Sequence, residues 1–248
     1  MHQPKQENTS SGKKFRIAAM GDLHIKEMTI GHYRELFTEI SEKADALVLC
    51  GDLTDLGLPN EAEILAEELS FCKIPVVGVL GNHDYEHGME DEVKTILQTQ
   101  MFILDEEPYV IGDVGFAGVK GFGGGFDHYV LSRWGEKIIK EFVNEAVNEA
   151  LKLENQLSKL ETKKKIVALH YSPIKDTIVG ESEEIYTYLG CSRLANPINW
   201  YGATAVFHGH AHHGTYEGKT LSNIPVYNCS IPVMTKKNKK QPYALIEI

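Results

Sequence analysis

The feature that most constrains this fold is a series of short apolar runs, each followed by glycine and polar residues. Three such runs and the two helically spaced segments between them lie at 15–20, 29–43, 46–50, 60–73 and 74–80. Apolar runs of this length are typical of strands buried on both faces. The Pro59-Asn60 pair is suited to open the second helix. This alternation predicts an α/β fold with a largely parallel sheet core.

The second half of the chain also alternates between strands and helices. Further strands are expected at 165–170, 203–208, 224–230 and 243–248, after a hairpin pair at 109–119 that turns at Gly112-Asp113. The glycine-rich stretch 121–126 is expected to be a mobile lid or a disordered connector, because glycines can act as hinges.

A long amphipathic helix is predicted from about Trp134 to Leu160. Its apolar residues recur at three- and four-residue steps, namely Ile138, Phe142, Ala146, Ala150, Leu153, Leu157 and Leu160. We expect this stripe to pack against the sheet, with partner binding as the alternative. No internal repeat or linker is evident, so residues 15–248 are predicted to form one domain.

Composition and charge limit the classes of partner. The 248 residues carry a formal net charge of −10, which argues against broad binding to nucleic acid. No apolar run is long enough to span a membrane. The polar segment 1–14 is expected to be a disordered lead-in without the apolar core of a signal peptide. Cysteines 50, 72, 191 and 229 form no Cys-x-x-Cys pair, which favours reduced thiols in a cytoplasmic protein.

Side chains that can bind metal ions follow five of the expected strands. In chain order they are Asp22, His24, Asp52, Asp55, Asn82, His83, Asp84, His170, His208, His210, His212 and His213. Ligands of open α/β sheets bind at the carboxyl ends of strands, so these groups are expected to converge. Residues two apart, such as His210 and His212, project to one side of an extended chain. Gly21, Gly51, Gly81 and Gly209 precede candidates and permit tight turns.

Together these motifs resemble the calcineurin-like metallophosphoesterase superfamily. The matching motifs are Asp22-x-His24, Gly51-Asp52-x-x-Asp55, Gly81-Asn82-His83-Asp84, Leu169-His170 and Gly209-His210-x-His212. The resemblance implies two mixed β-sheets packed as a sandwich with flanking helices, the αββα fold, with a metal site at the strand ends.

The resemblance also implies the ligands of two metal ions. One ion would be held by Asp22, His24, Asp52 and His212, and the other by Asp52, Asn82, His170 and His210, with Asp52 as the bridge. Mixed oxygen and imidazole ligands favour Mn, Fe, Zn or Co over Ca or Mg. Two dications against two carboxylates leave a net positive site, which would attract a phosphate ester to an acidic protein.

The implied reaction is attack of a metal-bridging hydroxide on phosphorus. We expect His83 to protonate the leaving oxygen and Asp84 to orient His83 and raise its pKa. Arg193 is a candidate to clamp a substrate phosphate, with a surface salt bridge as the alternative.

Several residues near these motifs have plausible structural roles instead. His208 is expected to be a buried or supporting residue, and His213 to lie in solvent or at the pocket rim. Asp55 could hydrogen-bond a ligand or cap the following helix. Asn82 could be a turn residue, although its motif favours a ligand.

The sequence leaves the substrate open. The stretch from Gly51 to Asp84 is similar to the branch that contains class III cyclic nucleotide phosphodiesterases, but 85–165 departs from that branch. We therefore predict a small-molecule phosphodiester or phosphomonoester as substrate. A nuclease of the same superfamily and a non-catalytic interaction module are the alternatives. Metal identity and oligomeric state are not predicted.

Overall fold

The structure is a computed structural model that describes residues 14–248. Nearly all of the expected lead-in, residues 1–14, lies outside the described residues. The helices are α1 (Arg34–Lys43), α2 (Pro59–Leu69), α3 (Glu90–Leu97), α4 (Lys137–Lys159), α5 (Tyr186–Leu189), α6 (Ala195–Tyr201) and α7 (Ile231–Lys237). Within this part of the chain, no helix is both long enough and apolar enough to cross a membrane.

The first sheet has the strand order β11-β1-β2-β3-β4. Its strands are β1 (Arg16–Met20), β2 (Ala46–Cys50), β3 (Val76–Val79), β4 (Phe102–Ile103) and β11 (Ala244–Glu247). All neighbours are parallel except β11, which pairs antiparallel with β1. The three expected strands at the start of the chain are therefore adjacent and parallel, as the alternation with helices predicts.

The second sheet has the order β5-β6-β7-β8-β10-β9. Its strands are β5 (Tyr109–Ile111), β6 (Val114–Val119), β7 (Lys164–Leu169), β8 (Ala205–His208), β9 (Glu217–Lys219) and β10 (Pro225–Asn228). The expected hairpin is present, with β5 antiparallel to β6. β9 is antiparallel to β10, and the other pairs are parallel. Both sheets are therefore mixed.

The two sheets pack face to face, and alternating side chains divide between two cores. In β2, Val48 joins the core between the sheets, whereas Leu47 and Leu49 join the core beneath α1, α2 and α3. In β7, Ala168 faces the shared core and Val167 faces the helices of the other side. Period-two alternation on a strand covered on both faces produces this division.

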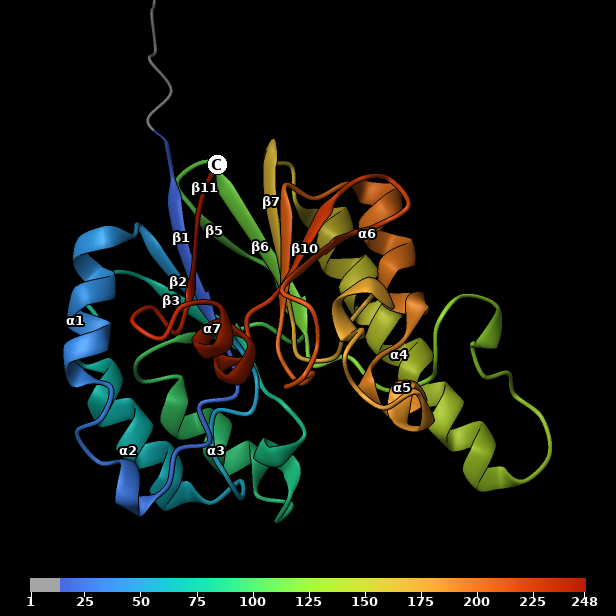
Figure 1. The fold of residues 1–248 in the computed structure, drawn as a ribbon, viewed down its shortest axis with the longest axis horizontal. Helices are drawn as coiled ribbons and strands as arrows, with labels where there is room; N and C mark the ends of the chain where they lie inside the picture. The colour runs from blue at the N-terminus through green and yellow to red at the C-terminus, as the bar shows by residue number, and fades with distance from the viewer. Residues whose placement is uncertain (1–13) are drawn as a thin grey trace, which may run out of the picture.

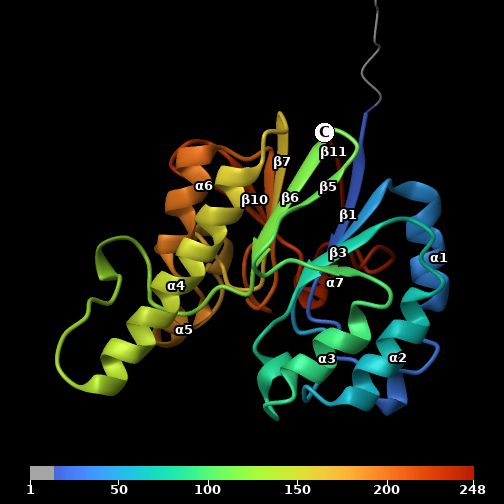
Figure 2. The same ribbon diagram turned by 180° about the vertical axis from the view of Figure 1, so that it is seen from behind.

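Figures 1 and 2 show the sheets between α1, α2 and α3 on one side and α4 and α6 on the other. The αββα sandwich expected from the resemblance is confirmed. The assignment of 15–248 to a single domain stays a prediction.

The apolar stripe of α4 is only partly a core element. The stripe is buried as expected at Ala146, Leu153 and Leu157, which are nearly inaccessible, but Ile138 near the start of the helix is 68% exposed. The expectation that the whole stripe packs against the sheet is wrong, because the first turns of α4 extend beyond the second sheet (Figure 1). The buried face also includes Gln156, whose amide bonds both the N–H and the C=O of Gly118.

The glycine-rich stretch 121–126 is a packed element. Gly121, Gly123, Gly124, Gly125 and Phe126 are buried. The N–H groups of Gly124 and Gly125 donate to the carbonyls of Thr187 and Gly190. A Cβ at Gly124 would lie 2.8 Å from the Cys191 sulfur. The interpretation as a lid or a disordered connector is wrong, because these glycines let the backbone pack tightly against 187–191.

Candidate metal centre

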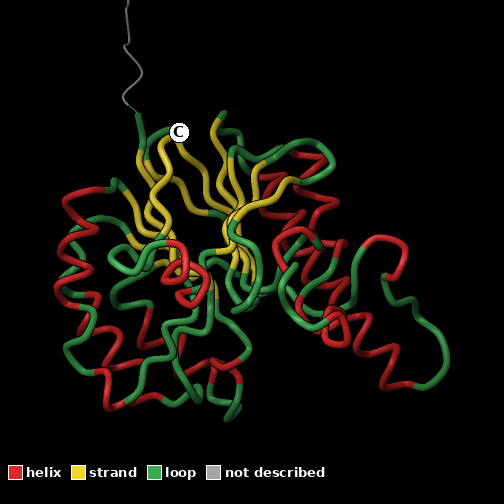
Figure 3. Tube along the Cα trace, viewed as in Figure 1, coloured by secondary structure: helices red, strands yellow, loops and turns green. Residues whose placement is uncertain are grey.

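The predicted donors lie in the loops that leave the carboxyl ends of β1, β2, β3, β7 and β8. Figure 3 shows loops gathered at that end of both sheets. The structure brings seven predicted residues together there, namely Asp22, His24, Asp52, Asn82, His170, His210 and His212. Parallel strands direct their carboxyl ends to one edge, and the face-to-face packing places the two edges side by side.

Six of the seven donors form two neighbouring groups, and His24 also belongs to a third group with Asp55 and His83. The first contains Asp22, His24 and His212, with donor atoms within 4.8 Å of one another, and His212 Nε2 lies 2.9 Å from Asp22 Oδ1. The second contains Asp52, His170 and His210. These groups match the three-residue cores of the two ligand sets that the resemblance implies.

Asp52 lies between the two groups. Its Oδ1 is 3.3 Å from His170 Nε2, and its Oδ2 is 3.9 Å from His24 Nε2. The carboxylate therefore directs one oxygen to each group. The backbone N–H of His83 donates to Oδ1 at 2.9 Å and fixes this orientation.

Three atoms of types that bind metal ions meet at His170. Its Nδ1 donates to the Cys50 carbonyl at 2.9 Å, which leaves Nε2 as the ring nitrogen directed at the other donors. That nitrogen lies 2.8 Å from Asn82 Oδ1 as well as 3.3 Å from Asp52 Oδ1. Imidazole nitrogen, amide oxygen and carboxylate oxygen grouped in this way form a donor set that fits a transition metal ion.

A second observation that fits a metal concerns His24. Both of its ring nitrogens are buried, and neither has a hydrogen-bond partner among residues 14–248. Buried polar atoms are almost always paired, so an unpaired imidazole requires an explanation such as an ion. The His24 ring packs edge-on against His83 and His212.

Glycines allow the loops to approach each other. A Cβ on Gly51 would lie 2.6 Å from His170 Nδ1, and a Cβ on Gly209 would lie 2.5 Å from Asp22 Oδ2. Any residue other than glycine would displace a candidate ligand at these two positions. This explains why glycines precede the polar motifs in the sequence.

Backbone strain is concentrated at the candidate centre. Asp22, His24, Asp52 and His210 have φ angles of 61°, 45°, 48° and 68°. Residues other than glycine avoid this region, at a cost of about 1–3 kcal/mol each. The surrounding structure maintains four such residues in one site, and strain of this kind clusters at functional sites.

Burial and neighbouring charges set the protonation of the donors. Burial lowers the pKa of His210 to about 3 and also lowers that of His24. Burial opposes ionisation of Asp22, but the hydrogen bond from His212 and nearby imidazoles outweigh it and lower its pKa. Burial raises the pKa of Asp52. Near neutral pH, His24 and His210 are therefore neutral and can offer lone pairs to a cation.

The prediction that Asp84 orients the His83 ring is wrong. Asp84 is fully buried and accepts hydrogen bonds from the backbone of Leu53, Thr54 and Gly81 and from the Thr54 hydroxyl. It therefore ties the β2 loop to the β3 loop. The His83 ring instead uses Nδ1 to bond the Asp55 carbonyl at 2.7 Å. The sequence could not reveal that the Asp55 carbonyl takes the place of the Asp84 carboxylate, because every residue has a backbone carbonyl.

The Arg193 guanidinium contacts the loop that precedes α4. Its Nη2 donates to the Leu131 carbonyl at 2.8 Å, and Nη1 lies 3.7 Å from the Cys191 sulfur. Within residues 14–248 Arg193 forms no salt bridge, so that alternative is wrong, whereas the phosphate clamp stays a prediction.

The other histidines and Asp55 take the supporting roles that the sequence left open. His208 is buried and contacts Thr177 Oγ1 and the Gly209 carbonyl, whereas His213 is exposed. Asp55 lies 3.5 Å from His24 Nδ1 and does not cap α2, whose N-cap position is Leu58.

Asn228 is a supporting residue that the sequence analysis missed. Its buried side chain donates to the Ala211 carbonyl at 2.7 Å, between His210 and His212. The signal in the sequence that could have indicated Asn228 is its position as a polar residue at the end of the apolar run that begins at 224.

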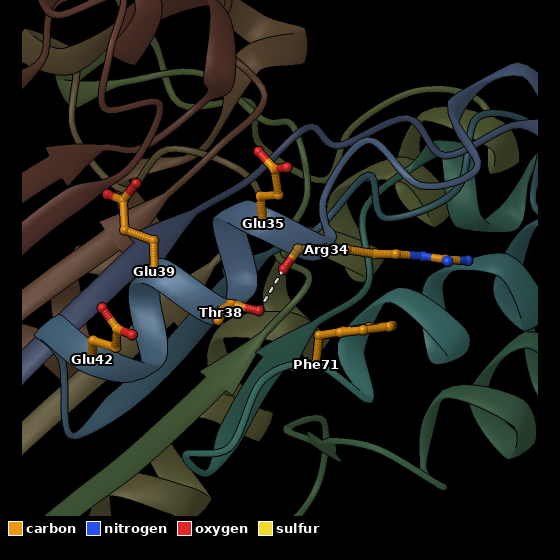
Figure 4. A pocket seen from close by; sticks show the side chains of 6 residues that line it. All are labelled: Arg34, Glu35, Thr38, Glu39, Glu42 and Phe71. Carbon is orange, nitrogen blue, oxygen red and sulfur yellow. Dashed lines mark hydrogen bonds between the residues drawn. The ribbon is translucent and has the colours of Figure 1, made fainter.

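A surface hollow elsewhere has the wrong charge for phosphate. It lies on α1, and Figure 4 shows Glu35, Glu39 and Glu42 along it, with Arg34 extending away from them. Arg34 pairs with Glu67 and Glu68 on α2. The three glutamates would repel an anion, so the carboxyl ends of the strands are the better candidate site.

Comparisons with known proteins agree with this geometry. A family model described as "Calcineurin-like phosphoesterase" matches residues 15–214. A curated protein of Arcobacter nitrofigilis, named "Probable glycerophosphodiester phosphodiesterase GpdQ", is 25% identical over 214 residues, which cover 79% of this chain and 71% of that protein.

Solved structures share the fold. The phosphopantetheinyl hydrolase PptH of Mycobacterium tuberculosis has a TM-score of 0.68 at 11% identity, over 94% of this chain and 96% of that one. TT1561 of Thermus thermophilus has a TM-score of 0.53 at 16% identity, over 90% and 92%. Metallophosphoesterases use divalent metal ions. The family model spans most of the chain, so the chain belongs to the calcineurin-like phosphoesterase family and is a phosphoric ester hydrolase.

Proposed function

We propose that this enzyme hydrolyses a small phosphodiester at a centre of two metal ions. Asp22, His24, Asp52 and His212 would hold one ion, and Asp52, Asn82, His170 and His210 the other. The observation that carries this proposal is the convergence of His170 Nε2, Asn82 Oδ1 and Asp52 Oδ1, three atoms of types that bind metal ions, with His170 Nε2 2.8 Å from Asn82 Oδ1 and 3.3 Å from Asp52 Oδ1. Nitrogen and oxygen donors in this mixture favour Mn, Fe or Zn.

The two ions, when bound, would supply Lewis acidity and an activated water for attack on phosphorus. The protein's own contribution is to orient the reacting groups. Nδ1 of His83 bonds the Asp55 carbonyl, which leaves Nε2 as the ring nitrogen that could act on a substrate. His83 would serve as the acid that donates an Nε2 proton to the leaving oxygen. Asp84 supports this arrangement by holding the loops of Asp52 and His83 together.

Two observations support a diester over a monoester. A phosphomonoester carries a second negative charge near neutral pH, which enzymes commonly neutralise with an arginine clamp. Arg193, the arginine predicted for this task, bonds Leu131 instead. The curated relative from Arcobacter nitrofigilis is also named as a phosphodiesterase.

The test compares hydrolysis of bis(p-nitrophenyl) phosphate with that of p-nitrophenyl phosphate after loading with Mn, Fe, Zn or Co. We expect about two metal ions per chain and a higher kcat/KM for the diester. Asp52→Asn should lower metal content and abolish turnover, whereas a surface variant, Glu42→Gln, should do neither. Failure of every metal to support turnover of either ester would contradict the proposal.

Two further measurements define the substrate. Cleavage of 3′,5′-cyclic AMP would support the cyclic nucleotide branch. Cleavage of DNA or RNA at low salt with manganese would favour the nuclease alternative, which the net charge of −10 makes an unfavourable electrostatic match. We also propose a reducing compartment such as the cytoplasm, because all four cysteines are unpaired.

A further inference from the structure

A row of four aromatic rings leads away from the candidate centre. Tyr171 lies 4.4 Å from His210, Phe122 lies 5.9 Å from Tyr171, Phe142 lies 4.9 Å from Phe122, and Tyr188 lies 6.3 Å from Phe142, all measured between ring centroids. We call Tyr171, Phe122, Phe142 and Tyr188 the aromatic row. The centroid distances are those of ring pairs in contact.

Burial decreases along the aromatic row. Tyr171 is 8% exposed, Phe122 and Phe142 are partly buried, and Tyr188 is 61% exposed. Ile138 lies one turn before Phe142 on α4 and is 68% exposed. Ile138 belongs to the first turn of α4, and Figure 2 shows this end of the helix projecting beyond the second sheet.

Backbone contacts attach the outer end of the row to the centre. The Tyr188 carbonyl accepts from His210 Nε2 at 3.1 Å, so the row and a candidate metal ligand are joined directly. The preceding carbonyl, of Thr187, accepts from Gly124 at 2.7 Å. The glycine stretch therefore holds Tyr188 in place.

A buried cation fixes the inner end. The Lys120 ammonium lies 5.0 Å from the Phe122 ring and 5.6 Å from the Tyr171 ring, and its side chain is 12% exposed. Cation–π attraction of about 0.5–2 kcal/mol per contact would restrain both rings. The surface is therefore formed before any ligand arrives, which lowers the entropic cost of binding.

We propose that the aromatic row binds the organic group of the substrate, an apolar group about the size of an aromatic ring esterified to the phosphate. This inference rests on the proposed function, because it assumes that a phosphate binds at the metal centre. The occupant follows from continuity. Phosphate held beside His210 places its ester substituent next to the Tyr171 ring, from which the row continues through Phe122 and Phe142 to Tyr188.

The experiment uses two diesters with the same leaving group, phenyl p-nitrophenyl phosphate and methyl p-nitrophenyl phosphate. We expect the wild type to prefer the phenyl ester. Tyr188→Ala and Phe142→Ala should each lower kcat/KM for the phenyl ester about three- to tenfold, the size of an aromatic contact, and leave the methyl ester within about twofold. Trp200→Ala is the control, because Trp200 is an 82% exposed aromatic residue on α6, outside the row.

A binding measurement separates this inference from the proposed function. Calorimetric titration with diphenyl phosphate and with dimethyl phosphate needs no turnover. If Tyr188→Ala weakens binding of diphenyl phosphate and leaves binding of dimethyl phosphate unchanged, the inference is supported. If it weakens binding of both phosphates equally, or of neither, the inference is overturned. Hydrolysis of the two esters tests the proposed function separately, and failure to hydrolyse either ester would overturn only that function.

Discussion

Replacing Gly209 with alanine should weaken metal binding, whereas a glycine substitution away from the donors that destabilises the fold to a similar extent should not. The new Cβ would lie 2.5 Å from Asp22 Oδ2 and 2.8 Å from the Cys50 carbonyl, whereas real Cβ contacts essentially never fall below 3.0 Å. The Asp22 carboxylate or the 209–212 loop must therefore move by about half an ångström, at an overpacking cost of about 1–3 kcal/mol. Gly209 has no positive φ, so the backbone adds no strain of its own.

That displacement matters because metal ligands tolerate little error. Ligand distances must hold within about 0.2 Å, so a shift of half an ångström at Asp22 should cost about 10- to 100-fold in metal affinity. Competition with a fluorescent chelator would measure the affinity. Urea unfolding in the presence of a chelator would measure the metal-free stability.

The matched control is Gly202→Ala. Gly202 has a φ of 73°, and a Cβ there would meet nothing within 4 Å. This variant should lose about 1–2 kcal/mol of unfolding free energy through backbone strain and keep wild-type metal affinity. Wild-type affinity in Gly209→Ala, or an equal loss of affinity in both variants, would refute the reasoning.

Three other outcomes are expected. His83→Ala should lower kcat about 100-fold or more for an ester with a poor leaving group and much less for an ester that releases p-nitrophenolate, with unchanged metal content. His213→Ala is the control and should leave kcat for both esters unchanged. Equal losses on both esters in His83→Ala would contradict the acid role. Arg193→Ala should increase proteolysis of the 127–136 loop, because the loop loses its hydrogen bond from Arg193 to the Leu131 carbonyl, and should leave diester turnover within about twofold. A large loss of turnover would instead support the prediction that Arg193 binds the substrate phosphate. Removing metal with a chelator should lower the midpoint of thermal unfolding, since an ion at 100 times its Kd stabilises the fold by about 2.7 kcal/mol; an unchanged midpoint would argue against metal binding at these donors.

The fold and the candidate ligands were largely predictable because both depend on local patterns. Apolar runs such as 46–50 are strands in any context that buries both faces. Glycines at 51 and 209 are required where a Cβ would strike a neighbouring donor, so they accompany the polar motifs in the sequence.

The failures share a different physical cause. The prediction for Asp84 depends on its neighbour in sequence, but the side chain accepts hydrogen bonds from Leu53 and Thr54 of the β2 loop as well as from nearby Gly81. The glycine stretch predicts mobility because glycine is flexible in isolation, whereas here it packs against 187–191. The first turns of α4 carry the same periodic stripe as the buried turns, and only their position relative to the second sheet leaves Ile138 exposed.

The sequence alone therefore determined which side chains could meet at the carboxyl ends of the strands, since the apolar runs, the polar residues that follow them and the period-two alternation are local features. The tertiary structure decided which groups orient His83, where Arg193 points and which apolar side chains stay uncovered beside His210. Those outcomes depend on contacts between residues far apart in the chain, and no local pattern encodes which distant backbone carbonyl will lie within hydrogen-bond distance.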